Sequence, residues 1–162
     1  MRKRKSGITI LRGSRSLLPL LGSLAIIYVA WKSLKKMTIK ERMLNVLGDA
    51  MSPVLAEMVF AQAAHETGNF TSPLYFSNNN CFGMKMPKIR PTTANKEQFG
   101  YAHYNTLEDS VKDYILWQKF VAFPQGLQTI DQFVTGLYTK SYFEAPLKEY
   151  LAGVKHFYNL YF

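Results

Sequence analysis

Apolar residues recur at helical spacing along most of the chain after residue 37, and polar breaks divide this pattern into predicted elements. Ser and Thr at such breaks suit helix N-termini, and Gly suits the left-handed residue that closes a helix. The pattern predicts helices over residues 38–47, 53–67, 106–120, 129–138 and 141–158. The last three begin at Thr106, Thr129 and Ser141, each followed three residues later by an acidic or amide side chain, as in a capping box.

Two short segments between the second and third predicted helices suit β-strands. Residues 82–86 and 99–104 are rich in apolar and aromatic side chains, and a stretch containing Pro and Thr separates them. We expect them to form a hairpin. Residues 69–81, with a proline and an asparagine triplet, are expected to be a loop. Helices around one small hairpin make an α+β fold.

The beginning of the chain differs from the rest. Residues 1–16 form a basic arm, residues 17–31 an apolar run and residues 32–37 a linker to a domain at 38–162. As a helix the run would span about 22 Å, against a hydrocarbon core of roughly 30 Å. Lys32 can extend to the interface and Tyr28 and Trp31 suit it, so the run is predicted to be a transmembrane anchor. A signal peptide and a buried core helix are the alternatives.

Charge is distributed unevenly. The net charge is +9, yet residues 1–40 hold ten Lys or Arg and no acid, whereas residues 41–162 hold ten basic and eleven acidic residues. A nucleic-acid-binding domain should carry a basic face of its own, so nucleic acid is not expected as a partner of the domain. The arm could contact anionic lipid head groups or nucleic acid. A single cysteine, Cys81, excludes an internal disulfide.

Glu66 is the strongest candidate for chemistry. It lies in the last turn of an apolar predicted helix that Gly68 ends. Apolar surroundings and the negative end of the helix dipole both raise the pKa of a carboxyl group. A raised pKa keeps the proton in place near neutrality, as the general acid of glycosidic cleavage requires. A solvated glutamate at a helix end is the alternative interpretation.

Four segments of the chain bear on this choice. They are Ala61-Gln62-Ala63-Ala64-His65-Glu66-Thr67-Gly68 with Ser72, then Asn79-Asn80-Cys81-Phe82-Gly83-Met84-Lys85, then residues 101–114, then residues 136–142. In order and spacing they resemble glycoside hydrolase family 73, the N-acetylglucosaminidases that include the flagellar rod-cap wall hydrolases. The resemblance implies a lysozyme-like fold, hydrolysis of β-1,4 bonds in peptidoglycan, no cofactor, and Glu66 as the catalytic acid.

The resemblance also implies roles for other residues. Glu97, the one acidic residue between Glu66 and Glu108, is the candidate second carboxylate, with a solvated turn residue as the alternative. Tyr138 matches the family's site tyrosine. The candidate substrate-binding residues are Asn79, Asn80, Phe82, Phe70 and Tyr104. Loop stabilisation is the alternative for the two asparagines, and core packing is the alternative for Phe70. Thr67 and Cys81 depart from the family pattern, which has Ser and often Leu there.

Several functions remain compatible with the sequence. A lytic transglycosylase or a muramidase would act on the same glycan, and a wall-binding module would not be catalytic. A peptidase using Cys81 and His103 lacks the expected motif, and no metal-ligand spacing or phosphate loop is present. The expected setting is a membrane-anchored enzyme whose C-terminal domain faces the cell wall. Both a bacterial envelope enzyme and a phage lysis or virion-entry enzyme, anchored in a virion membrane, fit that description.

Overall fold

Six helices and two short strands make up residues 37–162, the part of the chain that the computed structural model describes. In chain order they are α2 (Ile39–Gly48), α3 (Pro53–Glu66), α4 (Pro73–Asn78), β1 (Lys96–Gln98), β2 (Tyr101–His103), α5 (Leu107–Phe120), α6 (Ile130–Thr139) and α7 (Leu147–Tyr161). Thr38–Phe162 form one compact unit. This content of helices and strands confirms the predicted α+β class.

Side-chain caps set the starts of five helices. Each cap accepts a hydrogen bond from the backbone N–H three residues later, and the caps are Thr38, Ser52, Ser72, Thr106 and Thr129. At α2 the side chain of Glu41 also accepts the N–H of Thr38, which completes a capping box. The helices predicted over 38–47, 53–67, 106–120 and 129–138 are confirmed. Ser72-Pro73 repeats the signal of Ser52-Pro53 and starts α4 inside a segment expected to be a loop.

The first predicted strand is wrong. β1 is Lys96–Gln98, which pairs antiparallel with β2 so that Lys96 lies opposite His103. The hairpin turn is Phe99-Gly100, both at positive φ. Residues 82–86 lie beside β2 and Met84 O accepts the N–H of Ala102 at 2.9 Å. They do not form a strand because Gly83, at φ +61°, interrupts the extended backbone.

The predicted start of the last helix is also wrong. α6 ends at Thr139, Ser141 follows with φ +52°, and α7 begins only at Leu147. Pro146 stands at the N-cap position, and a proline disfavours helical backbone in the residue before it. Residues 141–145 are therefore a connecting segment, and this segment contributes to the cleft described below.

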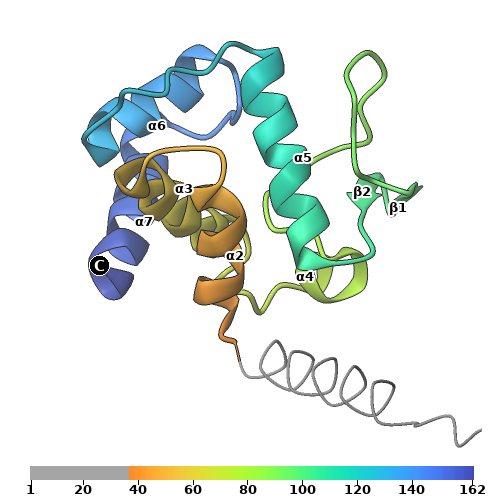
Figure 1. Ribbon diagram of the computed structural model, residues 1–162. Helices are drawn as coiled ribbons and strands as arrows, with labels where there is room; N and C mark the ends of the chain where they lie inside the picture. The colour runs from red at the N-terminus through yellow and green to blue at the C-terminus, as the bar shows by residue number, and fades with distance from the viewer. Residues whose placement is uncertain (1–36) are drawn as a thin grey trace, which may run out of the picture. The chain divides into compact units, whose positions relative to one another are not determined.

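Helix α3 is the centre of the core. Nine of the ten residues from Leu55 to Ala64 are buried, and they lie on every side of the helix, as expected of a helix surrounded by others. Helix α7 crosses it so closely that a Cβ on Gly153 would meet the His65 ring at 2.2 Å. In Figure 1, α5 stands between the group α2, α3, α6 and α7 and the side of the molecule that holds α4 and the β1–β2 hairpin. This mostly helical body with a small two-stranded sheet is consistent with a lysozyme-like α+β fold.

The basic arm at 1–16 and the apolar run at 17–31 lie outside the described residues, so the predicted anchor stays a prediction. Among the helices within residues 37–162, none is long and apolar enough to cross a membrane.

Candidate active site

A cleft of about 680 Å³ opens where the end of α3 meets the start of α7. One wall is the loop 82–85 together with Tyr101 of β2. The other is the segment 141–145, and Trp117 of α5 and Tyr150 of α7 also line the cleft. Aromatic rings with a few polar groups between them are the usual lining of a ligand site, and such rings suit the faces of sugars.

Glu66 enters this cleft as the last residue of α3. The helix ends there because buried Thr67 turns its hydroxyl back to donate to Ala63 O at 2.7 Å and accepts the N–H of Phe70 at 2.9 Å. Gly68, at φ +55°, then takes the left-handed conformation that leads the chain away. The Glu66 side chain is thus held at a fixed helix end rather than on a mobile loop.

The surroundings of Glu66 favour its protonated form. Burial raises the pKa of Glu66, and a hydrogen bond from the Tyr150 hydroxyl to Oε1 opposes that rise only in part. A carboxyl group that keeps its proton to higher pH can act as an acid in the cleft.

The loop 82–85 lies against the carboxyl group. A Cβ on Gly83 would stand 3.7 Å from Glu66 Oε2. Asn80, which is buried, shapes this loop: its amide donates to Met84 O and Ala102 O, both at 2.9 Å, and its oxygen accepts the N–H of Met84 at 3.1 Å. The wall beside Glu66 is therefore set by buried hydrogen bonds.

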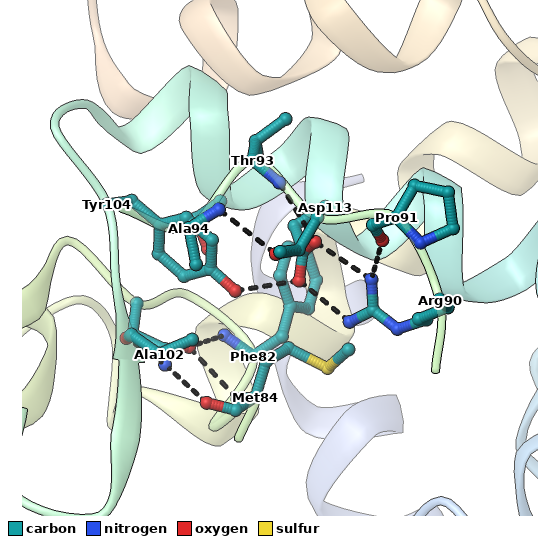
Figure 2. A network of polar contacts seen from close by, with 12 residues as sticks. Phe82, Met84, Arg90, Pro91, Thr93, Ala94, Ala102, Tyr104 and Asp113 are labelled. Atoms are coloured by element: carbon teal, nitrogen blue, oxygen red, sulfur yellow. Dashed lines mark hydrogen bonds and ion pairs between the residues drawn. The ribbon is translucent and has the colours of Figure 1, made fainter. Parts of the chain in front are cut away.

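A buried ion pair attaches the segment that follows this loop to helix α5 (Figure 2). Both carboxylate oxygens of Asp113 on α5 accept from the Arg90 guanidinium at 2.8 Å, with side chains 0% and 5% exposed. The Tyr104 hydroxyl donates to the same carboxylate at 2.8 Å. The backbone N–H of Thr93 also donates to it, at 3.3 Å. Burial by itself raises the pKa of Asp113, but these donors outweigh it and lower the pKa. Segment 90–93 is thereby fixed to α5.

Of the residues predicted for the site, Glu66 and Phe82 line the cleft. Phe82 is buried there and stacks on Tyr114 with ring centroids 4.1 Å apart. Glu97 is exposed on β1, and Tyr138 is 51% exposed on α6; neither lines the cleft. Their assigned roles stay predictions.

The other predicted substrate-binding residues have packing or loop contacts. Phe70 is buried against Phe60, and Tyr104 is buried on the Asp113 carboxylate. The side-chain amide of Asn79 donates to Tyr104 O at 3.0 Å. The amides of Asn79 and Asn80 are thus both hydrogen-bonded to backbone carbonyl groups. Their predicted roles in substrate binding stay predictions.

Cys81 and His103 do not meet the needs of a thiol peptidase. The Cys81 thiol is buried, and burial raises its pKa to about 12, so the thiolate is strongly disfavoured. His103 Nδ1 lies 2.9 Å from Asn95 Oδ1 on the hairpin side. Among residues 37–162 no cluster of His, Cys, Asp or Glu is arranged to hold a metal ion.

Sequence reasoning assigned no site role to several cleft residues or their partners, among them Tyr150, Tyr142, Glu144 and Gln62. Tyr142 donates to Phe82 O at 2.6 Å and joins the two walls. Gln62 had a local signal, since it lies one helical turn before Glu66 in an otherwise apolar stretch. Tyr150 had none, because it is 84 residues from Glu66.

Comparisons with known proteins place the chain in a family. The family model for Glucosaminidase, described as mannosyl-glycoprotein endo-beta-N-acetylglucosaminidase, matches residues 49–160, more than half of the chain. Protein bax of Escherichia coli (strain K12) is 38% identical over 71 residues, which are 44% of this chain and 26% of that protein. The chain thus matches about a quarter of the length of that relative.

A solved structure shares the fold. It is a chain of a type VI secretion system effector-immunity complex from Pseudomonas protegens, with a TM-score of 0.55 and 16% identity over 74% of this chain and 88% of that one. The family match contains Glu66, the loop 82–85 and Tyr150, and it confirms the resemblance drawn from the sequence. The chain belongs to the Glucosaminidase family.

Proposed function

We propose that the chain is an endo-β-N-acetylglucosaminidase that hydrolyses the β-1,4 bonds of peptidoglycan with Glu66 as the general acid. The observation that carries the proposal is the half-buried Glu66 carboxyl, with its raised pKa, in an aromatic-lined cleft of about 680 Å³. The description of the matching family, an endo-beta-N-acetylglucosaminidase, supports the same bond preference.

In this mechanism Glu66 donates its proton to the glycosidic oxygen as the bond to the sugar breaks. Tyr101 and Trp117 offer ring faces to the sugars, and exposed Lys85 places a positive charge in the wall where carboxylates of the peptide stems can approach. After the transfer Glu66 is a carboxylate that accepts from Tyr150, and it can then deprotonate the attacking water.

Two carboxyl groups line the cleft, Glu66 and Glu144. Glu97, predicted as the second carboxylate, lies on the exposed hairpin strand instead. Either of these side chains, or the acetamido group of the substrate, would assist the oxocarbenium-like transition state. A lytic transglycosylase, which needs one acidic residue, shares the geometry and is separated by its products.

The test is a digest of purified peptidoglycan whose fragments are identified by mass spectrometry. Reducing N-acetylglucosamine ends are expected. Glu66→Gln should lower turnover by roughly 10²–10⁴-fold, because the general acid is removed without a change of shape. Glu57→Gln, on the same helix and hydrogen-bonded to Tyr158 at 3.4 Å, is the control and should cleave normally.

Other outcomes each exclude part of the proposal. Reducing muramic ends would identify a muramidase, and 1,6-anhydro ends a lytic transglycosylase. Folded protein that binds the wall but leaves it intact would point to a non-catalytic module. A Glu66→Gln variant as active as the wild type would exclude Glu66 as the acid.

We also propose, from the sequence alone, that residues 17–31 attach the enzyme to a membrane with its domain facing the wall, in a bacterial envelope or a phage particle. Flotation of the whole chain with anionic vesicles tests this. Loss of flotation on deletion of residues 1–37 is expected, whereas flotation of residues 38–162 alone would place the membrane contact in the domain.

A further inference from the structure

The tyrosine that contacts Glu66 is itself held by a buried chain of side chains. The Tyr150 hydroxyl donates to Glu66 Oε1, Gln62 Nε2 donates to the Tyr150 oxygen at 3.3 Å, and the Tyr114 hydroxyl donates to Gln62 Oε1 at 2.5 Å. Gln62 and Tyr114 are 0% exposed and Tyr150 is 5% exposed. One hydrogen-bonded chain thus runs from α5 through α3 to α7 and ends on the carboxyl group.

The chain has a direction because an amide has distinct ends. A hydroxyl can donate or accept by rotating, but the oxygen of Gln62 only accepts and its nitrogen only donates. The Tyr114 hydroxyl faces the Gln62 oxygen, so the nitrogen of the same amide faces Tyr150. The Tyr150 oxygen is then already an acceptor, and its one proton is directed to Glu66.

The ring of Tyr150 is held by two neighbouring rings, so that only its hydroxyl group can rotate. Phe143 stacks on it with centroids 3.7 Å apart and planes 5° from parallel, and His65 meets it edge-on at 4.8 Å. With the ring held in this way, the orientation of the hydroxyl proton depends on the hydrogen-bonding partner behind it, which is Gln62.

This direction selects one oxygen of the catalytic carboxyl. Because Oε1 accepts from Tyr150, Oε2 is the oxygen left to carry the proton of neutral Glu66. Oε2 is the atom that faces the loop 82–85, 3.7 Å from the Cβ position of Gly83, in the wall of the cleft. The transferable proton is therefore on the oxygen beside the substrate space.

We propose that Gln62 is a positioning residue which, through Tyr150, keeps the catalytic proton on Glu66 Oε2 and stabilises the carboxylate that remains after proton transfer. This role rests on the proposed function of Glu66 as the general acid. Gln62 acts through Tyr150 and does not itself line the cleft.

The proposal has a consequence for the pH dependence. The hydrogen bond from Tyr150 lowers the pKa of Glu66 against the effect of burial. Losing that donor raises the pKa further. Since a general acid loses activity as the pH rises through its pKa, the alkaline limb of the rate profile then moves to higher pH. The maximal rate falls, because the carboxylate formed in the reaction is less well stabilised.

The experiment measures kcat and KM on peptidoglycan fragments across pH for Gln62→Met and Tyr150→Phe in the whole chain. Tyr150→Phe removes the donor to Glu66 and should move the alkaline limb upward by about one pH unit, as expected for the loss of a hydrogen bond to a charged group. Gln62→Met leaves the hydroxyl without its orienting partner and should move the limb in the same direction by a smaller amount. Both should lower kcat roughly tenfold with little change in KM, as expected for a misplaced acid. Gln62→Glu should give the largest shift, because a carboxylate accepts from both tyrosines and adds a like charge.

The matched control is Tyr158→Phe. Its hydroxyl also donates from α7 to a glutamate of α3, Glu57, at 3.4 Å, but outside the cleft. Its profile should coincide with the wild type. If Gln62→Met fails to fold, Tyr114→Phe removes the hydroxyl that orients the amide, and a carbon-13 titration of the Glu66 carboxyl in Tyr150→Phe reports the shift without turnover.

The outcomes separate the two proposals. An active Glu66→Gln variant would remove the general acid and the positioning role together. If Glu66→Gln is inactive while folded Gln62→Met, or Tyr114→Phe in its place, keeps the wild-type pH profile, only the role of Gln62 is excluded. A uniform loss of rate with no shift of the limb would show a merely structural residue.

Discussion

At Gly83 the backbone takes a φ of +61° next to the Glu66 carboxyl, and a Cβ there would stand 3.7 Å from Oε2. Two properties of glycine are used at this position, tolerance of the left-handed conformation and absence of a side chain. Gly100 also takes a left-handed conformation, with φ +77°, but a Cβ there would meet no other atom within 4 Å. Only the first property of glycine is therefore used at Gly100.

The pair of glycines gives a test of the space around Oε2. Gly83→Ala and Gly100→Ala should each lower the free energy of unfolding by about 1–2 kcal/mol, because an L-residue is strained at positive φ. Only Gly83→Ala should also lower kcat, since its methyl group occupies space beside the transferable proton. Urea unfolding and turnover assays measure both quantities. Equal activity of the two variants would show that this space is not used by the substrate.

The identity of the second catalytic carboxylate is also a question of single residues. Glu144 lines the cleft whereas Glu97 is exposed on β1 outside it. We expect Glu144→Gln to lower kcat more than Glu97→Gln, because a carboxylate must lie near the reacting sugar to stabilise its charge. Steady-state kinetics on the same glycan compares them. A stronger effect of Glu97→Gln would support the assignment made from the sequence, and no effect of either would favour assistance by the substrate.

At the scale of elements, the Arg90–Asp113 pair attaches the segment before β1 to helix α5. Removing one partner of a buried ion pair leaves the other unpaired, so Asp113→Asn should destabilise the fold by about 3–5 kcal/mol at neutral pH. Asp131→Asn is the matched control. Its carboxylate pairs with Lys155 at 2.8 Å on the surface, with side chains 59% and 45% exposed, and should contribute at most about 1 kcal/mol.

The same pair predicts acid sensitivity. The folded-state pKa of Asp113 is below its ordinary value of 3.8, so the stabilisation is present above that value and is lost as the pH falls through the lowered pKa. The difference in stability between wild type and Asp113→Asn should therefore shrink as the pH is lowered below about 4. Urea unfolding at a series of pH values measures it. A difference that stays constant would show that Asp113 titrates normally.

At the scale of the whole molecule, Thr38–Phe162 form a compact unit that begins with the capping box of α2 and contains every residue of the cleft. A fragment of residues 38–162 should unfold in one cooperative transition and digest soluble glycan fragments at the rate of the whole chain. Calorimetry and a glycan assay measure this. A fragment that folds but does not cleave would assign part of the activity to residues 1–37.

The sequence by itself determined the features that depend on near neighbours along the chain. The starts of α2, α3, α5 and α6 follow from a capping side chain and the apolar pattern after it, both within one or two turns. Glu66 was selected as the candidate acid because it lies in the last turn of an apolar predicted helix and because the residues around it resemble the family's motif. The hairpin prediction was right only for β2, because the partner of a strand is chosen by register and not by its own composition.

Only the tertiary structure decided what meets Glu66. Tyr150 reaches it from 84 residues away because α7 packs tightly across α3 at Gly153, and no local pattern in the sequence encodes that crossing. The tertiary structure also decided the hydrogen-bonding partners of the Asn80 amide, Met84 O and Ala102 O. A buried polar side chain binds whichever backbone groups the fold leaves without partners. Local propensities act over a few residues, whereas the chemical environment of a carboxyl group depends on helices brought together by burial of the core.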